Sequence, residues 1–188
     1  MHKFRRISRR QTGVTSIVEF GPTLWIVLIM VTFPLLAFGT IGMRYCFVNN
    51  AVQYAAEAGA CSRTFYANST NAQTGTTYLS ATNAVSQVIS KAQASWNGIT
   101  PSSIVTNIVI TPYAGGSSTI TSSKLTAAQM SQSANNLYTC QVVVTVSLQP
   151  LFPQTYFKGL MACPGLSAPL VTTVTSSRIY EYPQGLGT

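Results

Sequence analysis

The chain has 188 residues, of which 46% are hydrophobic and only 7% are charged, and its formal net charge is +8 at pH 7. This length fits one modest domain plus an anchor and leaves no room for a second core. Five of the eleven basic residues lie within the first ten positions. We therefore interpret the basic character as a signal for orientation in a membrane and not as a nucleic-acid-binding surface. With so few charges, the surface favours self-association over life as a free soluble protein.

The chain begins with a basic leader, residues 1–13, and an apolar run without any charge extends from Phe20 to Met43. A helix of that length reaches about 36 Å, which is enough to span a hydrocarbon core of about 30 Å. Because the basic residues cluster before the run, the positive-inside rule predicts a cytoplasmic N-terminus and an exported C-terminal part. The sequence therefore predicts a single-pass membrane protein.

Glu19 stands at the mouth of the predicted hydrocarbon layer. An acid is costly at this depth and marks a candidate functional residue. The plainer interpretation is a juxtamembrane acid whose carboxylate reaches the headgroups, and an ordinary anchor would need nothing more.

Residues 9–20, RRQTGVTSIVEF, resemble the leader and processing site of prepilins, specifically the TadE-like minor pilins of the tight-adherence (Tad/Flp) pilus. The small-residue segment 50–60 is similar to the helix that follows the membrane segment in that family. The end of the chain, where a strand runs into Leu151-Phe152-Pro153 and a final Val/Thr/Ser-rich strand follows, resembles the same family. The middle of the chain is generic.

The resemblance implies a minor pilin-like structural subunit that assembles, primes or caps a Tad-type pilus used in cell adhesion. A prepilin peptidase would cut on the cytoplasmic side after Gly13, where a residue without a Cβ atom lets the backbone approach the protease. Glu19 would then pair with the amino terminus of a neighbouring subunit, so that two charges costly in lipid neutralise each other. A cut after Gly13 makes Glu19 the sixth mature residue, whereas the family usually has the acid fifth, so a cut after Val14 stays open.

The partners implied are the prepilin peptidase, other pilin and minor pilin subunits, the inner membrane and the pilus assembly platform, with the C-terminal domain in the periplasm. Two other interpretations remain. One is an unprocessed, membrane-anchored binding module of the cell envelope. The other is a general secretory signal with a cleavage site near Ala37-Phe38-Gly39, although the apolar run is longer than the usual signal core.

Beyond Arg44 the helix is expected to continue, so that residues 14–62 form a transmembrane and stem helix. Pro22 and Pro34 should kink it or unwind it locally. Three- and four-residue spacing predicts one buried face in the stem. That face carries Tyr45, Val48, Val52, Ala55 and Gly59.

Residues 63–188 are expected to form an α+β head of one helix packed on an antiparallel sheet of at least three strands. The helix is predicted over 79–96, with Trp96 in the core, after a loop over 63–77. Strands are predicted over 104–111, 138–148 and 170–180. The segment 113–136 is expected to be a long exposed connection with a short helix near 125–130.

The four cysteines follow the membrane segment, in an oxidising compartment, so at least one disulfide is expected. Cys46 and Cys61 are about 22 Å apart if one helix joins them, too far to pair. The expected bridge joins two of Cys61, Cys140 and Cys163. Cys46 is expected to be a small buried residue of the helix.

The sequence contains no catalytic constellation, and no enzyme activity or cofactor is predicted. The single histidine, His2, lies in the leader, so the exported part cannot form a Cys-His pair or a histidine metal site. Only Glu57 and Glu181 are acids of the head, which disfavours paired-carboxylate chemistry and Ca²⁺ binding. The wide cysteine spacing disfavours zinc.

Overall fold

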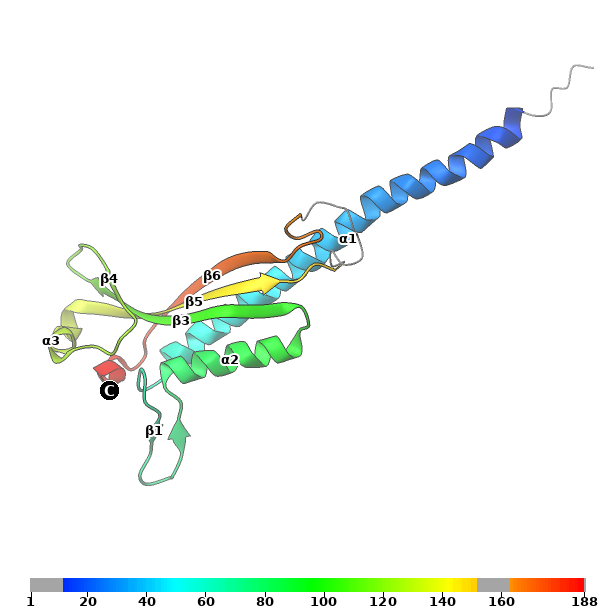
Figure 1. Cartoon of the computed structure of the whole chain (residues 1–188). Coiled ribbons are helices and arrows are strands. Elements are labelled where there is room, and N and C mark those ends of the chain that lie inside the picture. Colours follow the sequence, from blue (N-terminus) through cyan, green and yellow to red (C-terminus); the bar gives the residue numbers. More distant parts are fainter. Residues whose placement is uncertain (1–11, 152–162, 188) are drawn as a thin grey trace, which may run out of the picture.

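The computed structural model describes residues 12–151 and 163–187, with side chains from Phe20 onward except that of Ser133. Figure 1 shows a long helix that projects from a small head. The head combines one further long helix with a four-stranded antiparallel sheet. The predicted α+β fold class is therefore confirmed.

Helix α1, Thr12–Ala60, is continuous over 49 residues and contains both Pro22 and Pro34. The expected local unwinding at these prolines is wrong, because the helix passes both without interruption. Residues 20–36 are exposed or half-exposed, whereas Ala37 and Ile41 are buried. The helix thus divides into a projecting apolar half and a half that packs on the head.

The packed half of α1 presents a stripe of small and β-branched side chains to the head. Tyr45 was expected on this stripe but is 44% exposed, because the stripe continues from Val48 back through Arg44 and Ile41 and leaves Tyr45 to one side. The expectation was correct for Val48, Val52, Ala55 and Gly59, which are all buried.

The main sheet has the strand order β4-β3-β5-β6, and every neighbouring pair is antiparallel. Its strands are β3 (Ile99–Pro112), β4 (Thr119–Thr121), β5 (Asn136–Leu148) and β6 (Leu170–Ile179). β5 alternates as predicted, and its inward side chains are buried against the helices. They are Tyr138, Cys140, Val142, Val144, Val146 and Leu148.

Helix α2, Ala81–Ser95, begins where the Ser80 side chain accepts a hydrogen bond from the Asn83 backbone N–H. Its buried face includes Ala81, Val85 and Ile89, as predicted. Trp96 was expected to fill the core, but it is 37% exposed. The helix ends at Ser95 and Trp96 has an extended backbone, which turns its side chain away from the buried face.

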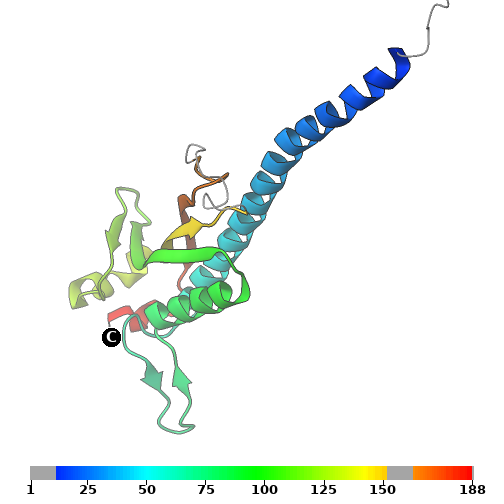
Figure 2. The ribbon, with the colours of Figure 1, turned by 45° about the vertical axis from the view of Figure 1, so that its right-hand side comes forward.

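Both long helices cover the same face of the sheet. Helix α1 contacts β5 and β6, and α2 contacts β3 and α1, as Figures 1 and 2 show from two directions. The hydrophobic core lies between these helices and the inward side chains of the sheet. The end of α1 meets the segment that follows β6, since the Glu181 N–H donates to the Ala60 carbonyl (3.1 Å).

Short elements occupy the end of the head farthest from the projecting half of α1 (Figure 1). The predicted loop 63–77 contains part of a small ribbon, β1 (Ser69–Thr70) paired with β2 (Thr77–Tyr78). The predicted connection 113–136 contains β4 and a short helix α3, Ala127–Ser131, which has a capping box. Two 3-10 helices complete the description, η1 (Ser133–Asn135) and η3 (Pro183–Gly187).

Candidate functional site

The predicted processing and assembly residues lie at the very start of α1. Gly13 and Val14 fall in its first turn and Glu19 about two turns from its beginning, and the backbone is helical at all three positions. Their side chains lie outside the described part of the chain. The cleavage bond and the role of Glu19 therefore stay predictions.

The projecting half of α1 is apolar on all sides. By length and composition, the described helix from Phe20 to Ala60 can cross a membrane: its most apolar 18-residue window has a mean hydropathy of 2.3 and is only 11% buried. Trp25 is 66% exposed and Met30 is 73% exposed. A core helix of a soluble protein would be covered by its own domain, so this exposure favours an external apolar environment.

A junction of three residues joins α1 to the head where the apolar run ends. The guanidinium of Arg44 donates a hydrogen bond to the Gln149 carbonyl, beyond the end of β5. It also lies against Gly98, where a Cβ atom would come within 2.7 Å of Arg44 Cζ. Gly98 has a φ of +85°, a backbone conformation that disfavours any residue with a side chain. The Arg44 guanidinium fills the space where that side chain would lie.

Aromatic packing extends this junction by one turn of α1. The rings of Phe47 and Trp96 are tilted by 47°, with centroids 4.7 Å apart. The sequence marked Asn97-Gly98 as a helix stop, but no local pattern linked Gly98 to Arg44, which is 54 positions earlier. This junction is the part of the site that sequence analysis missed.

Deeper in the head, Gly59 of α1 lies over Cys140 of β5. A Cβ atom at residue 59 would come within 2.9 Å of the Cys140 sulfur and 3.0 Å of Val85 Cγ2. Burial raises the pKa of Cys140 to about 11. The neighbouring Tyr180 hydroxyl is also buried, and burial, together with the adjacent Cys140 thiol, raises its pKa. Both groups stay neutral at physiological pH and act as packing residues.

A third cluster lies where α1 ends. An open depression of about 540 Å³ is lined by Glu57, Cys61, Arg178 and Glu181, among others. Partial burial raises the pKa of the Cys61 thiol, and the nearby Glu181 and Glu57 carboxylates raise it further. A raised pKa lowers the thiolate fraction, so Cys61 is not an activated nucleophile.

The expected disulfide is absent, because all four cysteines are free in the structure. Cys140 is buried beneath Gly59, whereas Cys61 is exposed beside Glu181. Cys163 belongs to the loop whose Gly165 lies against Ile41, about 30 Å along α1 from Cys61. The position of Cys163 therefore separates it from Cys61 and Cys140. Cys46, expected to be buried, is exposed on the side of α1 away from the head.

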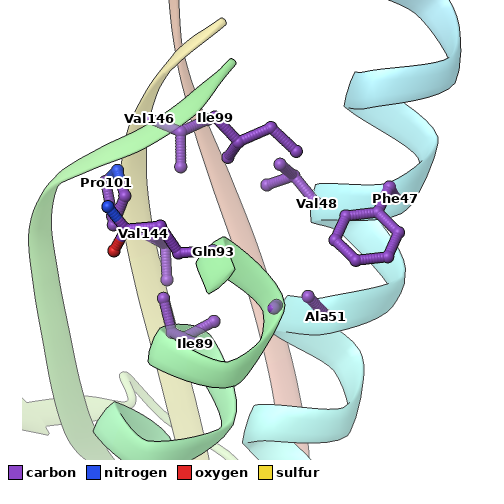
Figure 3. A pocket seen from close by; sticks show the side chains of 10 residues that line it. Phe47, Val48, Ala51, Ile89, Gln93, Ile99, Pro101, Val144 and Val146 are labelled. Atoms are coloured by element: carbon purple, nitrogen blue, oxygen red, sulfur yellow. The ribbon is translucent and has the colours of Figure 1, made fainter. Parts of the chain in front are cut away.

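A partly open cavity between α1, α2 and the sheet has a volume of about 20 Å³. Figure 3 shows that Val48, Ile89 and Val144 approach it from α1, α2 and β5. Its lining is almost entirely apolar, and its volume suits about one water molecule. This cavity is too small to bind a metabolite or cofactor.

In the described residues, no group of three or more His, Cys, Asp or Glu side chains is arranged to hold a metal ion. The chain was compared with protein-family models, with curated proteins and with solved structures, and no match was found. The function proposed below therefore depends on the sequence resemblance and on the geometry of α1.

Proposed function

We propose that this chain is a minor pilin-like structural subunit of a Tad-type adhesive pilus. In this proposal it inserts into the inner membrane with its N-terminus in the cytoplasm and its head in the periplasm. A prepilin peptidase removes the basic leader, and the mature subunit helps to assemble, prime or cap the filament. The observation that carries the proposal is the single helix α1, which joins the segment that resembles a processing site to the core of the head.

The shape of α1 supports this role. Its 49 residues form a rod about 74 Å long, and among the described residues its buried positions begin at Ala37. Because the projecting half is apolar around its circumference, lipid or the stems of other subunits can cover it. A subunit of this shape can exchange its lipid neighbours for protein neighbours without refolding its head.

In this proposal, the Glu19 carboxylate makes the interaction that favours the assembled filament over the separate subunits. Removal of the leader after Gly13 or Val14 creates a charged amino group one to two helical turns from the Glu19 carboxylate of the same chain. In a filament, the amino group of one subunit pairs with Glu19 of a neighbour. This pairing offsets the free-energy cost of burying each charge in an apolar environment. The assembly platform brings the stems together for this pairing.

The test is the N-terminal residue of the mature protein, determined by mass spectrometry of the membrane fraction and of the sheared surface fraction. A start at Val14 or Thr15, together with recovery in the sheared fraction, is the expected result. An intact Met1 in both fractions would overturn the proposal and favour the unprocessed, membrane-anchored binding module instead.

A further inference from the structure

The head has one end that lies beside α1 just where the apolar run stops. We call this the membrane-proximal surface; it consists of residues 96–101, 149–151 and 163–169. Arg44 contacts Gly98 and Gln149 within it, and a Cβ atom on Gly165 would lie 3.6 Å from Ile41 Cδ1. In Figure 1 the α2–β3 turn and the end of β5 point along α1 toward its projecting half.

The three segments of this surface are uncharged and expose apolar side chains. Its three segments contain no Asp, Glu, Lys or Arg. They expose Trp96, Leu151, Pro164 and Pro169, and Tyr45 of α1 is exposed at the same level. Tyrosine and tryptophan are enriched at membrane interfaces, because one end of each ring system is apolar and the other is polar. The surface therefore suits contact with a lipid headgroup layer.

Among the residues that the structure describes near this surface, Arg44 carries a charge. About 36 Å of apolar helix precedes it, slightly more than the hydrocarbon thickness, so it falls in the outer headgroup layer. Its Nε is buried and has no hydrogen-bond partner in the described part of the chain. Its side chain also borders an open depression shared with Ser95, Trp96 and Asn97. The part of the guanidinium that borders this depression can donate an N–H hydrogen bond to a phosphate oxygen.

We propose that the membrane-proximal surface rests on the outer leaflet, with Arg44 bound to a phospholipid phosphate and the Trp96 ring at the boundary between headgroups and acyl chains. The head is then held at a fixed height on the bilayer before assembly and does not swing on its anchor. This inference rests on the membrane insertion in the proposed function, and its test must separate the two.

The chain allows such a test because it contains only two tryptophans, Trp25 in the projecting helix and Trp96 in the surface. The full chain is reconstituted into phospholipid vesicles that carry bromine either near the headgroup or near the end of the acyl chain. Trp25→Phe leaves Trp96 as the single fluorophore, and Trp96→Phe leaves Trp25. A far-end control carries Tyr113→Trp with both natural tryptophans changed to Phe.

We expect Trp96 to be quenched at least twofold more by the shallow bromine than by the deep bromine, and the tryptophan at position 113 to be quenched by neither. Quenching of Trp25 without quenching of Trp96 would overturn the inference while leaving membrane insertion intact. That result would favour a protein, and not the bilayer, as the partner of the membrane-proximal surface. Quenching of neither natural tryptophan would overturn insertion itself, and with it the membrane part of the proposed function.

The phosphate is tested separately. Arg44→Gln should lower the shallow quenching of Trp96 at least twofold without changing that of Trp25. Because this variant also loses the junction with Gly98, a second measurement uses the unmodified surface: Trp25→Phe protein in galactolipid vesicles, which lack phosphate, should show the same loss. Added inorganic phosphate should not restore the quenching. Equal quenching of Trp96 in phospholipid and galactolipid vesicles would overturn the phosphate contact.

Discussion

Gly59 of α1 lies directly against Cys140 of β5: a Cβ atom on residue 59 would lie 2.9 Å from the Cys140 sulfur. Real Cβ atoms do not come this close to a neighbour, so a side chain at residue 59 must displace the Cys140 side chain or the backbone that carries it. The neighbouring Val85 closes the other side. Three elements of the core, α1, α2 and β5, therefore pack together at Gly59, where only a hydrogen atom fits in place of a side chain.

We expect Gly59→Ala to destabilise the head by about 1–2 kcal/mol, since overpacking costs about 1–3 kcal/mol and alanine returns up to about 1 kcal/mol through helix propensity. Urea unfolding in detergent, followed by circular dichroism, measures this change. The matched control is Gly42→Ala, which lies on the same helix with open space around it and should not destabilise. Cys140→Ala should partly relieve the first substitution, so strictly additive effects would contradict the proposed contact.

Gly98→Ala should loosen the junction between the head and α1. Its φ of +85° is nearly that of Gly115, +84°, but only Gly98 has the Arg44 guanidinium against it. Both substitutions should cost about 1–3 kcal/mol through backbone strain. Gly98→Ala should cost at least about 1 kcal/mol more, because the added methyl also displaces a packed side chain. Thermal unfolding of the two variants makes the comparison, and equal losses would show that the Arg44 contact contributes nothing.

Stability should fall in alkaline solution because of Cys140. Its pKa is about 11 in the folded chain and 9.0 without burial, so the neutral thiol favours folding below pH 9 and this contribution is lost as pH rises toward 11. The difference corresponds to at most about 2.7 kcal/mol. Unfolding free energies measured from about pH 8 to about pH 10.5 should fall more steeply for the natural chain than for Cys140→Ala. Parallel curves would exclude Cys140 as the source.

Replacement of Glu19 tests the assembly step. Glu19→Ala should leave membrane insertion and the folded head unchanged but reduce surface piliation at least tenfold, because the amino group of a neighbour would lose its charge partner. Glu57→Ala is the matched control: Glu57 is also an acid of α1, but it is exposed beside the head. Electron microscopy counts the pili. Normal piliation by Glu19→Ala would contradict the proposed role.

The strands and helices with a clear period were predictable from sequence. β5 alternates apolar and polar residues over its length, and α2 repeats apolar residues at helical spacing, so both were predicted within a few residues. β3 begins at Ile99, five residues before the predicted strand. The prediction began too late because Thr100-Pro101-Ser102-Ser103 has the composition of a turn. Pairing of Pro101 with Val146, next to a shift in register, overrides that local preference.

Properties that depend on distant contacts were not predictable. The position of Trp96 depends on where α2 stops, and one residue decides whether the ring joins the buried face or leaves it. The cysteine pairing required distances between segments that no spacing in the sequence supplies. The Arg44 junction likewise combines three segments far apart along the chain, and none carries a local signature of the contact.

The backbone hydrogen bond between Glu181 and Ala60 has a consequence for biogenesis. α1 is made before β6, yet β6 covers part of the same core as the packed half of α1. Until β6 has been made and exported, an anchored chain leaves the part of this core that β6 covers exposed. A truncated product would thus be fixed in the bilayer with an exposed apolar surface, the feature by which quality-control proteases recognise unfinished proteins. Only full-length subunits would escape degradation.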